Sequence, residues 1–501
     1  MVSYFPYIFL FLSVSFKGFA LSNEAAQIAC NQLASTLGTT LIENSTGPDF
    51  NNTVSAPRNL FNTQINFSPA CIVLAQEASD VQVAMKTIFQ HEVDYAVLAG
   101  GHSANEGWDN VNGGILISFE RMDQVSYDPQ RDTITIQPGV RWGPAAVALE
   151  PQGVAPVGGR VDDVGTGLLL GGGLSFLSQA HGFSADNFVE LDVVLVNGSM
   201  VTATAVNEYA DLFRALKGGA NRFGIVTRYE VQAIHTGKSE EKTWFGGSIT
   251  YPEDSFEDLA RAISHFVHDN VDPRAVHLSN FARVGLTTTA TATLFYNGST
   301  LPQDIFGEFL SIPSLSSNLT SLSYLDIALA LAGTSPLGQG TLLGAKALIG
   351  GSSSSDDSTD QLYLNTLHLW KNLSDSFSPS EIAISTLDFT PVPISQISYG
   401  RPESGRGGNA IDPPLVGYNQ IVIGNILPVG VKVVSEEIED AVRLFLEQAP
   451  SSPGIPLFIN ECDSNQEVFA TYGGYDFLKA TYAKYDPTRF NIRHTNGPIG
   501  L

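Results

Sequence analysis

The stretch Tyr95-Ala96-Val97-Leu98-Ala99-Gly100-Gly101-His102-Ser103 places an apolar run directly before two glycines, a histidine and a small polar residue. The apolar run predicts a buried strand. The glycines let the following chain curve tightly, so that several backbone N–H groups converge without side-chain crowding and can bind phosphate oxygens. His102 adds a nucleophilic ring nitrogen beside this expected phosphate site. The alternative is a histidine that only forms a hydrogen bond within a turn.

A second glycine cluster, Gly165-Thr166-Gly167-Leu168-Leu169-Leu170-Gly171-Gly172-Gly173, follows later in the chain. Together the two clusters resemble the flavin-binding half of the vanillyl-alcohol oxidase superfamily, and most closely the berberine bridge enzyme-like FAD-linked oxidoreductases. The resemblance implies an α+β fold with a two-subdomain PCMH-type FAD-binding domain. It also implies a substrate domain in which helices cover an antiparallel sheet.

The resemblance further implies that His102 carries FAD through a covalent bond. Val161 stands where relatives with two covalent links have a cysteine, and a valine cannot form a thioether, so we expect a single link. The other expected cofactor contacts come from both glycine clusters, the segment Phe223-Gly224-Ile225-Val226-Thr227 and one C-terminal residue. They are Ala99, Gly100, Gly101, Ser103, Val164, Gly165, Thr166, Gly167, Gly172, Ile225, Val226 and Asn460.

The segment Phe458-Ile459-Asn460-Glu461-Cys462-Asp463 resembles the Y-x-N-Y-x-D strand of the family, with Glu461 in place of the second tyrosine. In many relatives that tyrosine helps to bind or deprotonate the substrate. Glu461 can act as the base if burial raises its pKa; the alternative is a solvated or ion-paired carboxylate. Strand alternation would turn Glu461 away from a flavin that Asn460 faces. Tyr399 is the next candidate for the base.

Length and the glycine pattern divide the chain into an expected signal peptide (1–20), a helix and loop (21–65), the FAD-binding domain (66–236), the substrate-binding domain (237–455) and a C-terminal segment (456–501) that returns to the FAD domain. Hydrophobic periodicity predicts the elements within these units. The expected helices are Ala25–Leu37, Ala78–His91, Pro144–Leu149, Asp211–Leu216, Phe256–Asn270 and Val434–Gln448. The expected strands are Cys71–Leu74, Tyr95–Leu98, Gly114–Ser118, Gln124–Tyr127, Thr133–Ile136, Phe188–Asn197, Met200–Ala203, Gly224–Val231, Thr287–Tyr296 and Glu381–Phe389.

The N-terminus indicates secretion. An apolar run over Tyr4–Phe16 precedes Gly18 and Ala20, which have the spacing that a signal peptidase prefers; the alternative is a buried first helix. Seven N-x-S/T sequons make glycosylation of several sites an expectation. They begin at Asn44, Asn51, Asn66, Asn197, Asn297, Asn318 and Asn372.

Three cysteines, Cys30, Cys71 and Cys462, leave one thiol over if a bridge forms in an oxidising compartment. We expect the bridge between Cys30 and Cys71, because both flank the start of the flavin domain that the resemblance implies. It would join the N-terminal helix to the first strand of that domain. The alternative is three buried thiols.

The composition of the chain limits the classes of molecule that it is expected to bind. A net charge of −25 argues against nucleic acid and anionic membranes, and no further segment is apolar enough to span a bilayer. The dinucleotide, P-loop, hydrolase and zinc motifs are also missing, so no metal is expected.

The sequence thus predicts a secreted FAD-dependent oxidoreductase that oxidises an alcohol, carbohydrate or secondary metabolite, with hydride transfer to flavin N5 and oxygen or another molecule as acceptor. The alternative is a flavin-containing binding or cyclisation-directing protein with little redox turnover. The sequence sets no oligomeric state.

Overall fold

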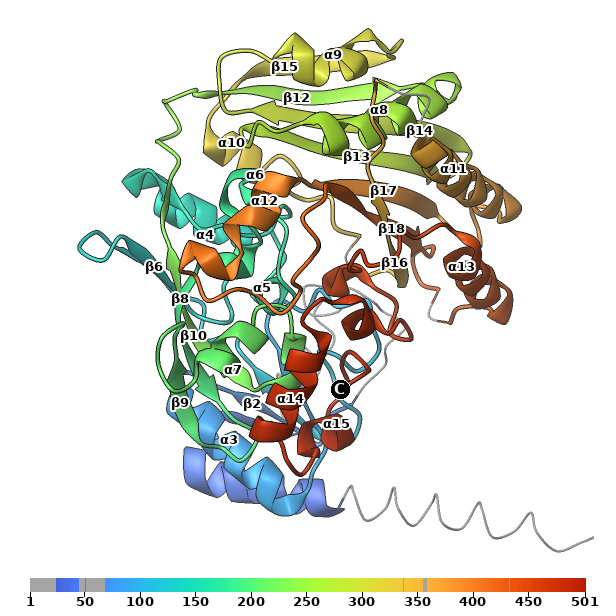
Figure 1. Cartoon of the computed structure of the whole chain (residues 1–501). Coiled ribbons are helices and arrows are strands. Elements are labelled where there is room, and N and C mark those ends of the chain that lie inside the picture. The colour runs from blue at the N-terminus through green and yellow to red at the C-terminus, as the bar shows by residue number, and fades with distance from the viewer. Residues whose placement is uncertain (1–23, 45–49, 51–67, 337, 355–357, 432) are drawn as a thin grey trace, which may run out of the picture.

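The computed structural model describes residues 24–44, 50, 68–336, 338–354, 358–431 and 433–501 (Figure 1). The expected signal peptide and the sequons at Asn51 and Asn66 lie outside the described residues. Three main sheets organise the chain: two small ones in the first half and a large one above them in the view of Figure 1. No helix in the described part of the chain has the length and apolar character needed to cross a membrane.

The first sheet has the order β1-β2-β4-β3, in which β2 and β3 pair in parallel with β4. Strands β2, β3 and β4 are short apolar runs that are almost wholly buried, as expected when both faces of a parallel sheet are covered, whereas the edge strand β1 pairs antiparallel with β2 and is only partly buried. Helix α3 packs against it and continues its apolar core. These elements are β1 (Ile42–Asn44), β2 (Cys71–Leu74), α3 (Ala78–His91), β3 (Tyr95–Leu98) and β4 (Ile115–Ser118).

A disulfide joins this sheet to the preceding helix over residues 24–37. The bond links Cys30 in the helix to Cys71 in β2, with an S–S distance of 2.01 Å. The expected Cys30–Cys71 pairing is therefore confirmed, and Cys462 is a buried free thiol.

The second sheet is antiparallel, with the order β5-β6-β10-β8-β9. The Asn197-Gly198 turn joins β8 to β9, and Gly198 adopts a φ of +76° there. Because Leu195 already bonds across this turn to Ser199, β8 ends three residues earlier than the periodicity predicts. The elements are β5 (Val125–Asp128), β6 (Thr133–Ile136), α4 (Trp142–Leu149), β8 (Phe188–Val194), β9 (Met200–Ala203), α7 (Ala210–Ala215) and β10 (Ile225–Gln232).

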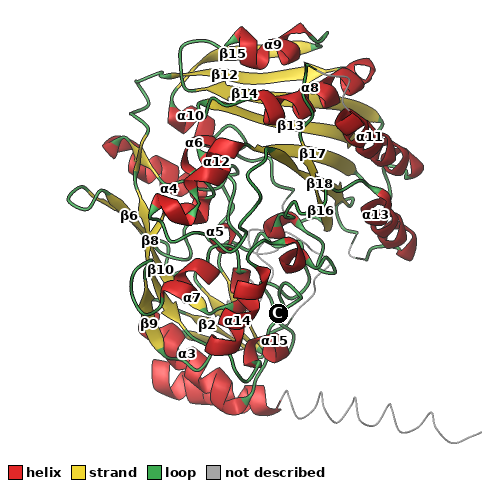
Figure 2. Cartoon of the chain, in the orientation of Figure 1, coloured by secondary structure: helices red, strands yellow, loops and turns green. Residues whose placement is uncertain are grey.

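The large sheet is antiparallel, with the order β15-β12-β14-β13-β17-β18-β16. Its strands are β12 (Trp244–Tyr251), β13 (Ala275–Val284), β14 (Thr287–Tyr296), β15 (Ser316–Leu322), β16 (Thr341–Ile349), β17 (Ile384–Val392) and β18 (Tyr418–Ile426). One face packs in a common apolar core with α8 (Phe256–Asp269), α9 (Gln303–Ser311), α11 (Ser358–Ser376) and α13 (Glu436–Gln448) (Figure 2). The opposite face turns toward the first half of the chain and supplies one wall of the site described below.

The C-terminal residues return to the first half. Helix α14 (Tyr475–Tyr485) lies beside α7, and Phe490 of α15 (Phe490–His494) enters the core of the first sheet. The buried guanidinium of Arg222 donates hydrogen bonds to the carbonyls of Thr495 and Pro498. Short elements complete the connections: β7 (Val154–Ala155), α5 (Gly167–Leu170), α6 (Ser178–His181), β11 (Ile234–His235), α10 (Tyr324–Ala328) and α12 (Ile394–Tyr399).

Candidate active site

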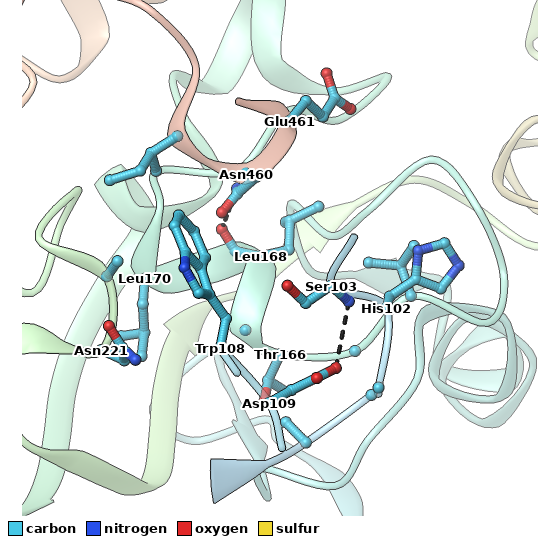
Figure 3. Close-up of a pocket in the computed structure, with 18 of the residues that line it drawn as sticks. His102, Ser103, Trp108, Asp109, Thr166, Leu168, Leu170, Asn221, Asn460 and Glu461 are labelled. Atoms are coloured by element: carbon cyan, nitrogen blue, oxygen red, sulfur yellow. Dashed lines mark hydrogen bonds between the residues drawn. The ribbon is translucent and has the colours of Figure 1, made fainter. Parts of the chain in front are cut away.

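A cavity of about 460 Å³ lies between the two glycine clusters and the large sheet (Figure 3). One end is lined by β3, β10 and the loops that follow β3 and precede α5. The other end is lined by β13, β16, β17 and β18 of the large sheet and by the 3₁₀ helix η7 (Ile459–Glu461). The cavity is therefore built by segments from the beginning, the middle and the end of the chain.

The two glycine clusters touch each other through their backbones. A Cβ atom on Gly100 would lie 2.5 Å from the Gly165 nitrogen, which no real side chain tolerates. Gly167 also lines the cavity, and a Cβ on it would meet no atom within 4 Å. Gly101 has a φ of +68°, in the region that favours glycine. The wall is thus formed by exposed backbone, which fits a large cofactor that lies close to the main chain.

His102 is held at this wall by two polar groups from separate segments. Its Nε2 atom lies 3.2 Å from Asp163 Oδ1 and 3.1 Å from Ser335 Oγ, and Ser335 donates a 2.6 Å hydrogen bond to the same Asp163 oxygen. Burial opposes ionisation of Asp163, but the hydrogen bonds from His102 and Ser335 lower its pKa to about 2. An ionised carboxylate can only accept, so Nε2 carries the hydrogen in the contact with Asp163.

Glu461 lies at the end of the cavity that the large sheet lines. Its Oε1 is 3.5 Å from the Arg160 guanidinium, which also donates a 2.7 Å hydrogen bond to Thr390 Oγ1. Burial raises the pKa of the Glu461 carboxyl, the charge of Arg160 opposes this rise, and nearby Asp388 adds to it. The carboxylate is therefore partly buried and a better proton acceptor than one in water.

The expected strand at Asn460 and Glu461 is wrong. Residues Ile459–Glu461 form a turn of 3₁₀ helix, closed by a bond from the Glu461 N–H to the Phe458 carbonyl. Consecutive side chains of a 3₁₀ turn do not alternate between two opposite faces, so both residues line the cavity. Figure 3 shows Asn460 directed at Leu168, to whose carbonyl it donates a 2.9 Å hydrogen bond, and Glu461 directed away from it.

Two expected site residues do not line the cavity. Gly172 packs inside the protein, where an added Cβ would lie 2.6 Å from Ile411. The Tyr399 hydroxyl donates to Asn187 Oδ1 at 3.1 Å, and the Arg406 guanidinium lies 4.1 Å from the Tyr399 ring centroid. The remaining expected residues all line the cavity: Ala99, Gly100, Gly101, His102, Ser103, Val164, Gly165, Thr166, Gly167, Ile225, Val226, Asn460 and Glu461.

Several polar residues at the cavity were not anticipated. Asp109 lines it close to the histidine loop, where the Ser103 N–H lies 3.4 Å from its carboxylate, and burial raises its pKa to about 7. Arg160 and Asp388 flank Glu461 at the other end. Arg160 directly precedes Val161, the residue that replaces the second attachment cysteine, and no motif marks it. Asp388 alternates with apolar residues in a predicted strand, which is the one signal that could have indicated it.

Comparison with known proteins shows similarity to proteins that bind FAD. Residues 69–204 match a family model described as an FAD binding domain. An uncharacterised FAD-linked oxidoreductase from Arthroderma benhamiae is 29% identical over 446 residues, which cover 86% of this chain and 87% of that protein.

Two solved structures share the fold. A carbohydrate oxidase from Microdochium nivale, solved with a substrate analogue, has a TM-score of 0.75 and 18% identity, covering 96% of this chain and all of the other. The BBE-like 1 protein of Physcomitrella patens has a TM-score of 0.74 and 19% identity, covering 92% of this chain and 97% of the other. At these identities the likeness establishes the fold and leaves the substrate to be argued from the cavity.

Proposed function

We propose that this chain is an FAD-linked oxidoreductase that binds FAD in the cavity through one covalent link to His102 and oxidises an alcohol. The match to an FAD binding domain, the similarity to an FAD-linked oxidoreductase and the fold shared with a BBE-like protein support this proposal. The alcohol lies between the cofactor and the large sheet. The supporting observation is that His102, the exposed backbone of both glycine clusters and a partly buried carboxylate line one cavity.

Separate residues of the chain would hold the cofactor and orient it. Asp163 and Ser335 fix the orientation of the His102 ring and so hold the imidazole at the cavity wall where the bond to the cofactor would form. Gly165 and Gly167 let the main chain approach the cofactor. When bound, FAD supplies the hydride acceptor, and molecular oxygen or another acceptor later takes the electrons.

Glu461 takes the hydroxyl proton of the substrate. The alcohol loses this proton and one hydride from the carbinol carbon, so it leaves as the carbonyl compound. Arg160 keeps Glu461 in place and limits the rise of its pKa, so that the carboxyl is ionised before the substrate proton arrives.

The covalent link is tested by the visible spectrum of the purified protein before and after acid precipitation. Yellow colour should remain in the wild-type pellet and be lost from the His102→Ala pellet, because only a covalent bond survives unfolding. Peptide mapping should find flavin on the peptide with His102 and on no cysteine peptide, since Val161 replaces the second attachment residue. A yellow His102→Ala pellet would place the bond elsewhere, and a colourless wild-type pellet would exclude a covalent bond.

We further propose that the protein is secreted through an N-terminal signal peptide and is glycosylated. Supporting this, the structure contains a disulfide, which persists in oxidising compartments. The sequon residues Asn197, Asn297, Asn318 and Asn372 are exposed, whereas Asn44 is partly buried in β1. Protein secreted by a eukaryotic host should therefore carry glycans at the four exposed sites and little at Asn44. Mass spectrometry after enzymatic deglycosylation in heavy-oxygen water checks each site, and four unmodified asparagines in secreted protein would contradict the proposal.

A further inference from the structure

The wall that the large sheet contributes to the cavity combines three aliphatic side chains with two polar residues of β17, Asp388 and Thr390. Leu278 of β13, Leu343 of β16 and Val422 of β18 line it, and Leu331, which follows α10, adds a fourth apolar side chain. Within the described residues, the aromatic side chains that line the cavity all come from the first half of the chain. They are Tyr95, Trp108, Phe119 and Tyr229.

An aliphatic wall selects against a molecule with many hydroxyl groups. Each hydroxyl that loses water and finds no partner costs free energy, whereas an apolar body gains free energy on the same wall. The polar groups on this side are few: Arg160, Asp388, Thr390 and Glu461. Thr390 already receives the Arg160 hydrogen bond at 2.7 Å. The wall therefore offers few hydrogen-bond partners to a substrate with many hydroxyl groups.

The charges on this side select against an anion. Glu461 and Asp388 are two carboxylates with a single guanidinium, Arg160, beside them. Both oxygens of Asp388 accept hydrogen bonds, one from Asn280 and one from Thr386 at 2.9 Å, so Asp388 is held in place beneath the site. Burial raises the pKa of both carboxyls. At a pH where both are ionised, a substrate carboxylate would face a net negative charge in a partly desolvated setting, where repulsion is strong.

We propose that this site takes a neutral alcohol with a largely aliphatic body and a single hydroxyl, which is presented to Glu461. The proposal rests on the function proposed above and names its substrate class. It separates this chain from the carbohydrate oxidase with which it shares its fold. Val422 and Leu343 hold the apolar body, and Asp388 keeps anionic compounds of the same shape out.

The test uses the holoenzyme and three probes at pH 8: geraniol, geranic acid with the same carbon skeleton, and glucose. Binding is followed as a change in the flavin absorption spectrum. Geraniol should reach half-saturation at a concentration about 100-fold below glucose and about 10-fold below geranate, the scale on which sites discriminate by apolar contact and charge. Asp388→Asn should narrow the gap between geraniol and geranate.

Leu343→Asn tests the wall itself and should weaken geraniol binding by about 10-fold, because it removes apolar contact. Leu286→Asn is the matched control, since Leu286 is 84% exposed in the turn between β13 and β14, and it should leave binding unchanged. Glucose binding as tightly as geraniol, geranate binding more tightly, or no spectral change with geraniol would each overturn the proposal. Anaerobic bleaching of the flavin reports separately on the reaction: tight geraniol binding without bleaching would contradict the proposed oxidation and leave the substrate class standing.

Discussion

At the scale of single residues, the proposed transfer of the substrate proton depends on Glu461, which stands where the resemblance implies a tyrosine. Glu461 is partly buried beside Arg160, and burial raises its pKa. A base must be ionised to act, so the rate of flavin reduction should fall as pH drops through this raised pKa. The setting makes Glu461 a base that works closer to neutral pH than an exposed carboxylate would.

Glu461→Gln should lower the rate of anaerobic flavin reduction by about 10²-fold or more, the usual scale for a general base. Stopped-flow absorbance across a pH series measures this rate. The variant should also lose the acidic limb of the profile, which a merely structural change would not remove. Glu467→Gln is the control, because Glu467 is exposed nearby. A variant with the wild-type rate at every pH would exclude Glu461 and make Asp388 the next carboxylate to test.

The residues of the cavity differ in how well the amino-acid sequence alone could predict their role. His102 and the glycines are local signals, since a strand and two glycines already define the shape of their loop. The contact between Arg160 and Thr390 joins residues 230 positions apart, and only the pairing of distant segments brings them together. Asp109 carries no motif, and its raised pKa comes from burial that the folded cavity creates. The sequence therefore indicated the glycine-lined wall of the cavity and missed most of the polar residues at its other end.

Elements with strong apolar patterns were predicted to the residue, and elements set by turn chemistry were not. The bounds of β2, α3, β3, β6, β9 and β14 are confirmed. Strand β17 begins at Ile384, not Glu381, because Glu381 closes a turn by accepting hydrogen bonds from the Ser378 backbone and hydroxyl. The Glu381 side chain forms hydrogen bonds with the backbone that stabilise a turn in place of strand pairing. The spacing of apolar residues does not reveal such side-chain hydrogen bonds.

Three helices on the outer face of the large sheet are tied together by one histidine. His265 of α8 contacts Glu308 of α9 at 2.8 Å and Asp360 of α11 at 3.0 Å. The Glu308 hydrogen bond is the largest influence that raises the pKa of His265 to about 9, against a value near 6.5 in an unfolded chain. The stabilisation is thus complete below about pH 6.5 and is lost as pH rises through 9.

His265→Gln should lower the denaturation midpoint in urea clearly at pH 6 and much less at pH 10. Tryptophan fluorescence in urea at the two pH values measures this difference. His235→Gln is the matched control: His235 is 65% exposed and pairs with Asp132 at the surface, so its loss should change little at either pH. An equal effect of His265→Gln at both pH values would show that its charge contributes nothing.

At the scale of the whole molecule, the cavity joins the two halves of the chain. His102 meets Ser335, Arg160 meets Thr390, and Asn105 donates a 3.0 Å hydrogen bond to the Cys462 carbonyl. Each contact pairs a segment of the first half with a segment of the large sheet's half or the C-terminal part. A cofactor in this cavity would therefore stabilise the chain as a unit, and would do so in proportion to its free concentration when no covalent bond retains it.

The last prediction uses this linkage. The His102→Ala protein, stripped of flavin, should gain thermal stability as free FAD is added, by about 2.7 kcal/mol at a concentration 100 times the dissociation constant. Wild-type holoprotein should not respond, because a covalent flavin already fills its cavity. Differential scanning fluorimetry across an FAD series measures both midpoints. A wild-type midpoint that rises in parallel with the variant would mean that its flavin exchanges freely, and a variant that ignores FAD would mean that the cavity between the glycine clusters and the large sheet is not where the cofactor binds.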